Sequence, residues 1–230
     1  MSFNPEKYIN ALEAFYFEYA VADDQFFMKK YMKNKFEFFG LRKTNREAAE
    51  KKFLEAYGLP DYDDLDILIP KLWEREKREF QYFGLVVTRK FEKKFDLPFI
   101  KVIELMITNK SWWDTVDFVA SNLAGNYFRI YPDTIPEITE KWMSSQNLWL
   151  QRSALLFQLK YKGNTDFDLM SAYILQLASS NEFFIRKAIG WCLREYSKTE
   201  PEKVISFVNE APISNFSKKE ALKWLERKKN

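Results

Sequence analysis

The chain has 230 residues, of which 47% are apolar, so it can bury a sizeable core and is not a mainly disordered protein. Its 36 basic and 33 acidic residues give a formal charge of only +3, so a nucleic-acid-binding face would require segregated charges. There is no histidine, and Cys192 is the only cysteine, which excludes histidine-dependent catalytic triads, histidine-ligated zinc and intramolecular disulfides.

Helical periodicity dominates the sequence. The first helix is expected over 5–22, because Asn4 suits the N-cap and Pro5 the first helical position. A second is expected at about 24–38, and a third from Thr44, with Thr44 as the cap and Glu47 three residues later. Further helices are expected at about 61–75, 77–93, 97–108, 111–123, 126–131, 134–144, 147–161, 165–178, 181–196, 201–209 and 217–228. No alternating run bounded by turn residues predicts a strand.

A weak internal repeat links two of these segments. Residues 149–160 line up with residues 183–194 at an offset of 34, which pairs Arg152 with Arg186. Helix pairs that recur at about 35–45 residues indicate an α-solenoid. We therefore predict an all-α fold, a solenoid of HEAT-like repeats with a concave basic groove, forming a single domain over 1–230.

The run from Ser111 to Asp117 holds two adjacent tryptophans and two aspartates. Trp113 and Asp117 lie four residues apart and so share one face of a helix. An aromatic plate beside a carboxylate can hold a cation, or stabilise one that forms during a reaction. The alternative is a buried tryptophan beside a carboxylate that caps a helix or pairs with a neighbouring arginine.

Two later segments carry basic residues among apolar ones. Arg152, with Lys160 two turns further on, could clamp a phosphate, because the planar guanidinium matches phosphate oxygens. The alternatives are a solvated stripe, or an internal pair with an aspartate of the neighbouring repeat. Lys187, Trp191 and Arg194 share one helix side and would suit a nucleic-acid backbone, although packing of Trp191 in the core is the plainer explanation.

With these residues in view, nearly the whole chain resembles the DNA alkylation repair family of HEAT-like repeat glycosylases, the AlkD group. The resemblance is strongest over 31–34, 110–117, 149–152, 156–162, 183–191 and 193–196. It implies hydrolytic excision of N3- and N7-alkylated purines, chiefly 3-methyladenine and 7-methylguanine, from duplex DNA in base excision repair. One position departs: where a relative carries Gln, this chain has Arg42, which bears on the duplex contacts of the N-terminal helices.

The resemblance also assigns roles to four residues. It makes Asp117 the catalytic carboxylate, Trp113 and Trp191 the tryptophans that flank the lesion, and Arg152 a contact to the DNA backbone. We expect Lys160, Lys187 and Arg194 to help hold that backbone.

We expect no cofactor and no metal. The chain shows no signal-peptide pattern and no apolar run of about 18 residues, so we expect a cytoplasmic protein with no membrane partner. We also expect a monomer, since a solenoid with polar end helices needs no partner. Two alternatives to the glycosylase stay open: a non-catalytic HEAT-repeat protein that binds damaged or branched DNA, and a helical protein–protein adaptor.

Overall fold

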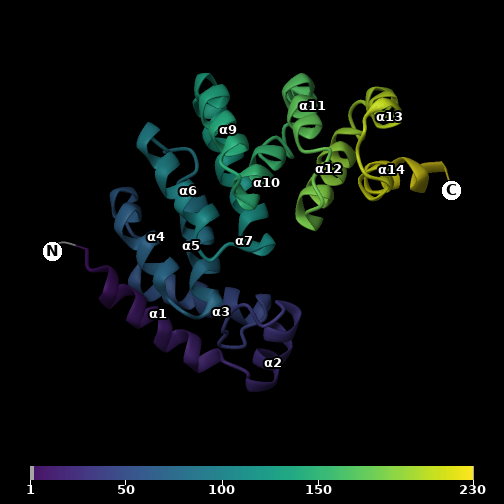
Figure 1. Ribbon diagram of the computed structural model, residues 1–230. Helices are drawn as coiled ribbons and strands as arrows, with labels where there is room; N and C mark the ends of the chain where they lie inside the picture. Colours follow the sequence, from purple (N-terminus) through teal and green to yellow (C-terminus); the bar gives the residue numbers. More distant parts are fainter. Residues whose placement is uncertain (1–2, 230) are drawn as a thin grey trace. The chain divides into compact units, whose positions relative to one another are not determined.

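The computed structural model describes residues 3–229, and helices dominate this range (Figure 1). The α-helices are α1 (Pro5–Tyr19), α2 (Ala22–Tyr31), α3 (Lys43–Tyr57), α4 (Leu65–Glu74), α5 (Arg78–Lys90), α6 (Ile100–Thr108), α7 (Trp113–Phe118), α8 (Gly125–Ile130), α9 (Ile135–Ser144), α10 (Leu148–Leu156), α11 (Phe167–Gln176), α12 (Phe183–Tyr196), α13 (Pro201–Glu210) and α14 (Asn215–Lys229). Short 3-10 turns lie at Tyr62–Asp64, Leu97–Phe99, Pro132–Thr134 and Lys162–Asn164. Residues 3–229 contain no β-strand, so the all-α, HEAT-like solenoid class is confirmed.

The chain divides into two compact units, Met1–Leu105 and Met106–Asn230, and the boundary falls within α6. The expected single domain over 1–230 stays a prediction.

In the first unit, α1 packs against α3 and α4, and α4 packs against α5. The predicted start of α1 is confirmed: the Asn4 side chain accepts a hydrogen bond from the Lys7 amide, and Pro5 is the first helical residue. The predicted cap at Thr44 is wrong, because α3 already begins at Lys43 and has no side-chain cap.

The second helix also ends earlier than predicted, at Tyr31 rather than near residue 38. Lys33 and Asn34 adopt left-handed backbone conformations with φ of 54° and 56°, which a continuing helix cannot include. Further on, the buried Glu79 carboxylate accepts hydrogen bonds from the amides of residues 39–41. Arg42, the position that departs from the family pattern, is mostly exposed and pairs with Asp24 at 2.6 Å.

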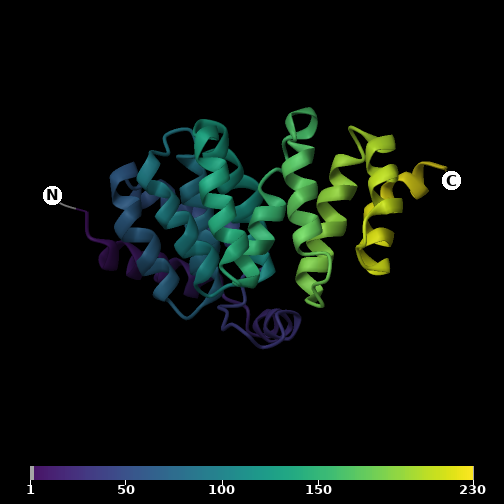
Figure 2. The same ribbon diagram turned by 45° about the horizontal axis from the view of Figure 1, so that its top comes forward.

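In the second unit, two rows of helices pack together. One row, here called the site row, consists of α7, α10, α12 and α14, in which each helix contacts the next. The other row, here called the backing row, consists of α9, α11 and α13 and packs against the site row. Helices α9 and α11 contact α10, and α13 contacts both α12 and α14. In both views, helices α9 to α14 follow one another in chain order (Figures 1 and 2). This alternation is the arrangement that stacked helix pairs produce.

Two boundaries in this unit differ from the sequence prediction. The helix expected over 111–123 changes after Phe118 into a π-helical segment, Val119–Ala124, which runs directly into α8. The helix expected over 147–161 ends at Leu156, and the chain then turns. Lys160 therefore does not share a helix face with Arg152.

Gly125, at the start of α8, explains how the chain packs at this turn. A Cβ atom built on Gly125 would lie 2.5 Å from the carbonyl oxygen of Phe157, so only glycine permits this close approach. The Tyr161 hydroxyl donates a hydrogen bond of 2.6 Å to the Gly125 carbonyl oxygen, and Arg129 donates one of 2.9 Å to the carbonyl of Lys160. These contacts fix the segment after α10 against the π-helix and α8.

Candidate functional site

A surface pocket of about 370 Å³ opens on the site row of the second unit. This volume lies within the range of small-ligand pockets, about 300–1,000 Å³. Its lining comes from α7, α10 and α12, and consists of Trp113, Asp117, Arg152, Phe183, Phe184, Lys187, Trp191 and Arg194. Six of the seven residues proposed from the sequence therefore lie around one pocket, and Lys160 does not.

The two adjacent tryptophans have different environments. Trp112 has an extended backbone just before α7 and is buried, with its ring 5.7 Å from that of Trp149 and 5.0 Å from that of Phe184. Trp113 is the first residue of α7, is partly exposed and lines the pocket. Burial of Trp112 in this aromatic cluster thus fixes the start of α7 and places the next tryptophan at the pocket.

Asp117 and Arg152 form a bidentate ion pair between α7 and α10. Arg152 donates from Nε to Oδ1 at 2.7 Å and from Nη2 to Oδ2 at 2.8 Å. Its Nη1 donates to the carbonyl oxygen of Phe184 in α12. The internal pair with an aspartate of a neighbouring repeat, an alternative left open by the sequence, is therefore present.

The Asp117 side chain is 16% exposed and the Arg152 side chain 3%, so the carboxylate reaches the pocket while its partner lies beneath it. Burial raises the pKa of Asp117, whereas the hydrogen bonds and charge of Arg152 oppose that rise. A bidentate pair requires the carboxylate in its ionised form. The pocket thus contains a fixed carboxylate together with aromatic side chains.

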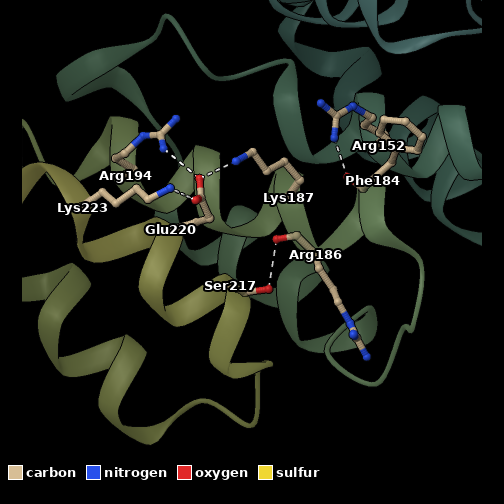
Figure 3. Close-up of polar contacts among 8 residues, drawn as sticks. All are labelled: Arg152, Phe184, Arg186, Lys187, Arg194, Ser217, Glu220 and Lys223. Atoms are coloured by element: carbon tan, nitrogen blue, oxygen red, sulfur yellow. Dashed lines mark hydrogen bonds and ion pairs between the residues drawn. The ribbon is translucent and has the colours of Figure 1, made fainter. Parts of the chain in front are cut away.

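A second group of charges includes two residues that line the pocket, Lys187 and Arg194. Lys187 and Arg194 both pair with Glu220 of α14, at 2.7 Å and 3.0 Å, and Lys223 pairs with the same carboxylate (Figure 3). Lys187, Trp191 and Arg194 were predicted to share one side of helix α12, and all three line the same pocket.

Two other basic residues have partners away from the pocket. Lys160 is exposed and donates a hydrogen bond of 2.6 Å to Oδ1 of Asn122 in the π-helical segment. Arg186, the repeat counterpart of Arg152, donates from Nε to the Ser180 carbonyl oxygen at 2.8 Å. Equivalent repeat positions therefore carry arginines with different tasks.

The lone thiol does not suit chemistry in this pocket. Cys192 follows Trp191 but is buried, and burial raises its pKa to about 12. It therefore remains a neutral thiol near pH 7. Among residues 3–229, no group of three or more acidic or cysteine side chains is arranged to hold a metal ion.

Three residues in or next to the pocket were not proposed from the sequence: Phe183, Phe184 and Glu220. Phe183 and Phe184 were visible only as members of the repeat and of the segments that resemble the family. Glu220 had no signal, since it is one acid in a helix rich in lysine, and only the packing of α14 against α12 reveals it.

Comparisons with known proteins agree with this architecture. The family model described as DNA alkylation repair enzyme matches residues 17–225. A solved structure described as a predicted DNA alkylation repair enzyme from Enterococcus faecalis is 30% identical, with a TM-score of 0.82 over 90% of this chain and 96% of that one. No curated protein matched the chain. No helix within residues 3–229 has the length and apolar character needed to span a membrane.

Proposed function

The chain belongs to the DNA alkylation repair enzyme family, and we propose that it is a monofunctional DNA glycosylase. Its substrates would be cationic N3- and N7-alkylated purines in duplex DNA, such as 3-methyladenine and 7-methylguanine. The observation that carries the proposal is that one pocket contains the Asp117 carboxylate, fixed by Arg152, together with Trp113 and Trp191.

The chemistry of such a lesion matches the residues of this pocket. Alkylation at N3 or N7 gives the purine a positive charge, so the base leaves without a proton donor, and a chain without histidine has no handicap. When the N-glycosidic bond breaks, its electron pair neutralises the base and leaves positive charge on the deoxyribose. The Asp117 carboxylate would stabilise that charge and orient a water; the water oxygen bonds to C1′ and its proton passes to solvent.

The two tryptophans would act on the charge of the base. Indole is the best aromatic partner of a cation, and such contacts contribute about 0.5–2 kcal/mol each. Trp113 from α7 and Trp191 from α12 reach the pocket from different helices, with the carboxylate of Asp117 lining the same space. This combination would favour a charged lesion over the neutral bases of ordinary DNA.

Arg152 has a double role in this proposal. Three of its five N–H donors bond to Asp117 and to the Phe184 carbonyl, so its first task is to orient the carboxylate and keep it ionised. Because the Arg152 side chain is only 3% exposed, the expected contact with a phosphate oxygen would require its two remaining N–H groups to become uncovered when DNA binds. Lys187 and Arg194 at the pocket, and Lys160 on the surface beyond α10, would add phosphate contacts that make binding depend on salt.

The test is the release of free base from duplex DNA that contains 7-methylguanine. We expect the protein to release 7-methylguanine, detected by chromatography, and to leave an abasic site in an uncut strand. Uncatalysed loss from the same DNA, incubated without protein, is subtracted. Salt-dependent binding without release would instead establish the non-catalytic DNA-binding alternative, and no DNA affinity at all would favour the adaptor.

A further inference from the structure

We propose that Glu220 is a positioning residue for DNA: one buried carboxylate fixes Lys187 and Arg194 as a pair at the pocket and keeps both away from Asp117. This inference rests on the proposed function, because it assigns the two cations to the backbone of the DNA that carries the lesion. It adds a residue of the last helix, which does not line the pocket, to the machinery of the site.

In this cluster a single carboxylate, that of Glu220, pairs with three basic side chains. The Glu220 side chain is only 4% exposed, yet its Oε2 accepts hydrogen bonds from Lys187 Nζ at 2.7 Å and from Arg194 Nη1 at 3.0 Å. Lys223 bonds to the other oxygen, Oε1. Figure 3 shows these contacts to Glu220. Lys187 and Arg194 remain 36% and 26% exposed, so the carboxylate is covered while the cations that it holds stay accessible.

The packing of α14 on α12 fixes the position of this carboxylate. A Cβ atom built on Gly190 would lie 2.4 Å from the Cβ of Glu220, so glycine at 190 is what lets the two helices approach here. Nearby, the Ser217 hydroxyl donates a hydrogen bond of 3.0 Å to the carbonyl oxygen of Arg186 (Figure 3). Glu220 therefore cannot move away from α12 without separating the helices.

The charge of Glu220 is secure over the working pH range. Burial raises its pKa, but the hydrogen bonds and charges of Lys187 and Lys223 outweigh that effect and lower the pKa to about 2. The carboxylate thus stays ionised and offsets part of the positive charge beside the pocket. Glu220 thus holds the cations in position for a phosphate while its negative charge balances part of their positive charge.

Two consequences follow if this charge is removed. Lys187 and Arg194 would lose their common partner, and Asp117 would be the carboxylate remaining at the pocket that could attract them. Their full positive charge would also attract any DNA backbone, whether or not it carries a lesion. Affinity for ordinary DNA should therefore rise while excision slows, an opposite pair of changes that a purely structural role would not produce.

The experiment compares Glu220→Gln with wild type and with Glu226→Gln. Glu226 lies on the same helix and is exposed, so it controls for the change in net charge. For Glu220→Gln we expect binding to undamaged duplex to tighten about three- to tenfold at low salt, with a salt dependence steeper by about one phosphate contact. Single-turnover excision of 7-methylguanine should fall about tenfold. Glu226→Gln should match wild type within about twofold in both measurements.

Unchanged affinity in Glu220→Gln, or weaker binding with a lower melting temperature, would overturn the proposal. If Glu220→Gln does not fold, Glu220→Asp decides: it keeps the charge but is one methylene shorter, so excision should fall with affinity unchanged, and wild-type excision would overturn the proposal. If wild type binds DNA but releases no base, the glycosylase proposal fails, while the affinity comparison still decides the role of Glu220.

Discussion

Arg152 holds Asp117 through two parallel hydrogen bonds of 2.7 Å and 2.8 Å, across the contact between α10 and α7. The arginine is nearly inaccessible, whereas the carboxylate still reaches the pocket. A planar guanidinium below a carboxylate fixes the direction of both oxygens, which a lysine could not do. We therefore expect the main role of Arg152 to be to orient the proposed catalytic carboxylate.

This relationship predicts the behaviour of Arg152→Lys. A lysine cannot form the bidentate pair, so we expect single-turnover excision to fall about 100-fold and the free energy of unfolding to fall by about 3 kcal/mol. Chemical denaturation and base release measure the two effects. Arg186→Lys, the same change at the equivalent repeat position outside the pocket, should retain excision. Equal losses of excision in both variants would argue against a specific role for Arg152.

The raised pKa of Asp117 predicts an acid limb in the pH profile. Because the proposed reaction needs the ionised carboxylate, excision should be lost as the pH falls through a pKa above the usual value for aspartate. The charge of Asp114 contributes to the rise, so Asp114→Asn should move the limb to lower pH. The measurement is the single-turnover rate against pH, corrected for uncatalysed loss. A limb that does not move in this variant would contradict the assignment.

The aromatic walls predict discrimination by charge. Trp191→Leu should keep an apolar wall but remove the π contact, and should weaken binding of a cationic lesion by about 2- to 30-fold. Binding of a neutral isostere of the same lesion should change much less, and Trp191→Phe should fall between. The measurement is the affinity of each protein for matched duplexes. Equal losses for the charged and neutral duplexes would mean that Trp191 contributes only packing.

A separate prediction concerns the stability of the first unit. Glu50 is buried, accepts a hydrogen bond of 2.9 Å from the Tyr16 hydroxyl, and lies 3.3 Å from Nε of Arg46. Burial raises its pKa from 4.5 to about 7, so the folded state binds a proton more tightly than the unfolded state. This contribution is fully present below pH 4.5 and is lost as the pH rises through 7, a change of about 3 kcal/mol.

Glu50→Gln removes this titration. Denaturant unfolding between about pH 4.5 and 8 should show a wild-type stability that declines relative to that of the variant by about 3 kcal/mol. Glu55→Gln, an exposed change in the same helix α3, is the control and should leave the difference near zero. Parallel curves for wild type and Glu50→Gln would show that Glu50 keeps its ordinary pKa.

Much of the fold was readable from local signals, because helical periodicity, caps and the repeat are properties of short segments. Asn4 and Pro5 fix the start of α1 in this way. The early end of α10 was not readable, because it depends on contacts of the following turn with Gly125 and Arg129 in another helix. The π-helix after α7 likewise has no local signature in the sequence.

The sequence predicts which residues belong to the candidate site, but it does not predict which of them contact each other. Asp117 and Arg152 are 35 positions apart, and only the stacking of α7 on α10 makes them partners. From the sequence, both a phosphate contact and an internal pair stay open for Arg152. Glu220 lies still further along the chain, and its link to Lys187 and Arg194 follows from the approach of α14 at Gly190.

The measurement that tests the central claim most directly is single-turnover release of 7-methylguanine by Asp117→Asn, with Asp114→Asn as the matched control. Asp117→Asn should bind the methylated duplex about as tightly as wild type and release base at least about 100-fold more slowly. Asp114→Asn removes a carboxylate three residues earlier in the same helix, outside the pocket lining, and should release base at nearly the wild-type rate. Release by Asp117→Asn at the wild-type rate would show that this carboxylate does not carry the reaction.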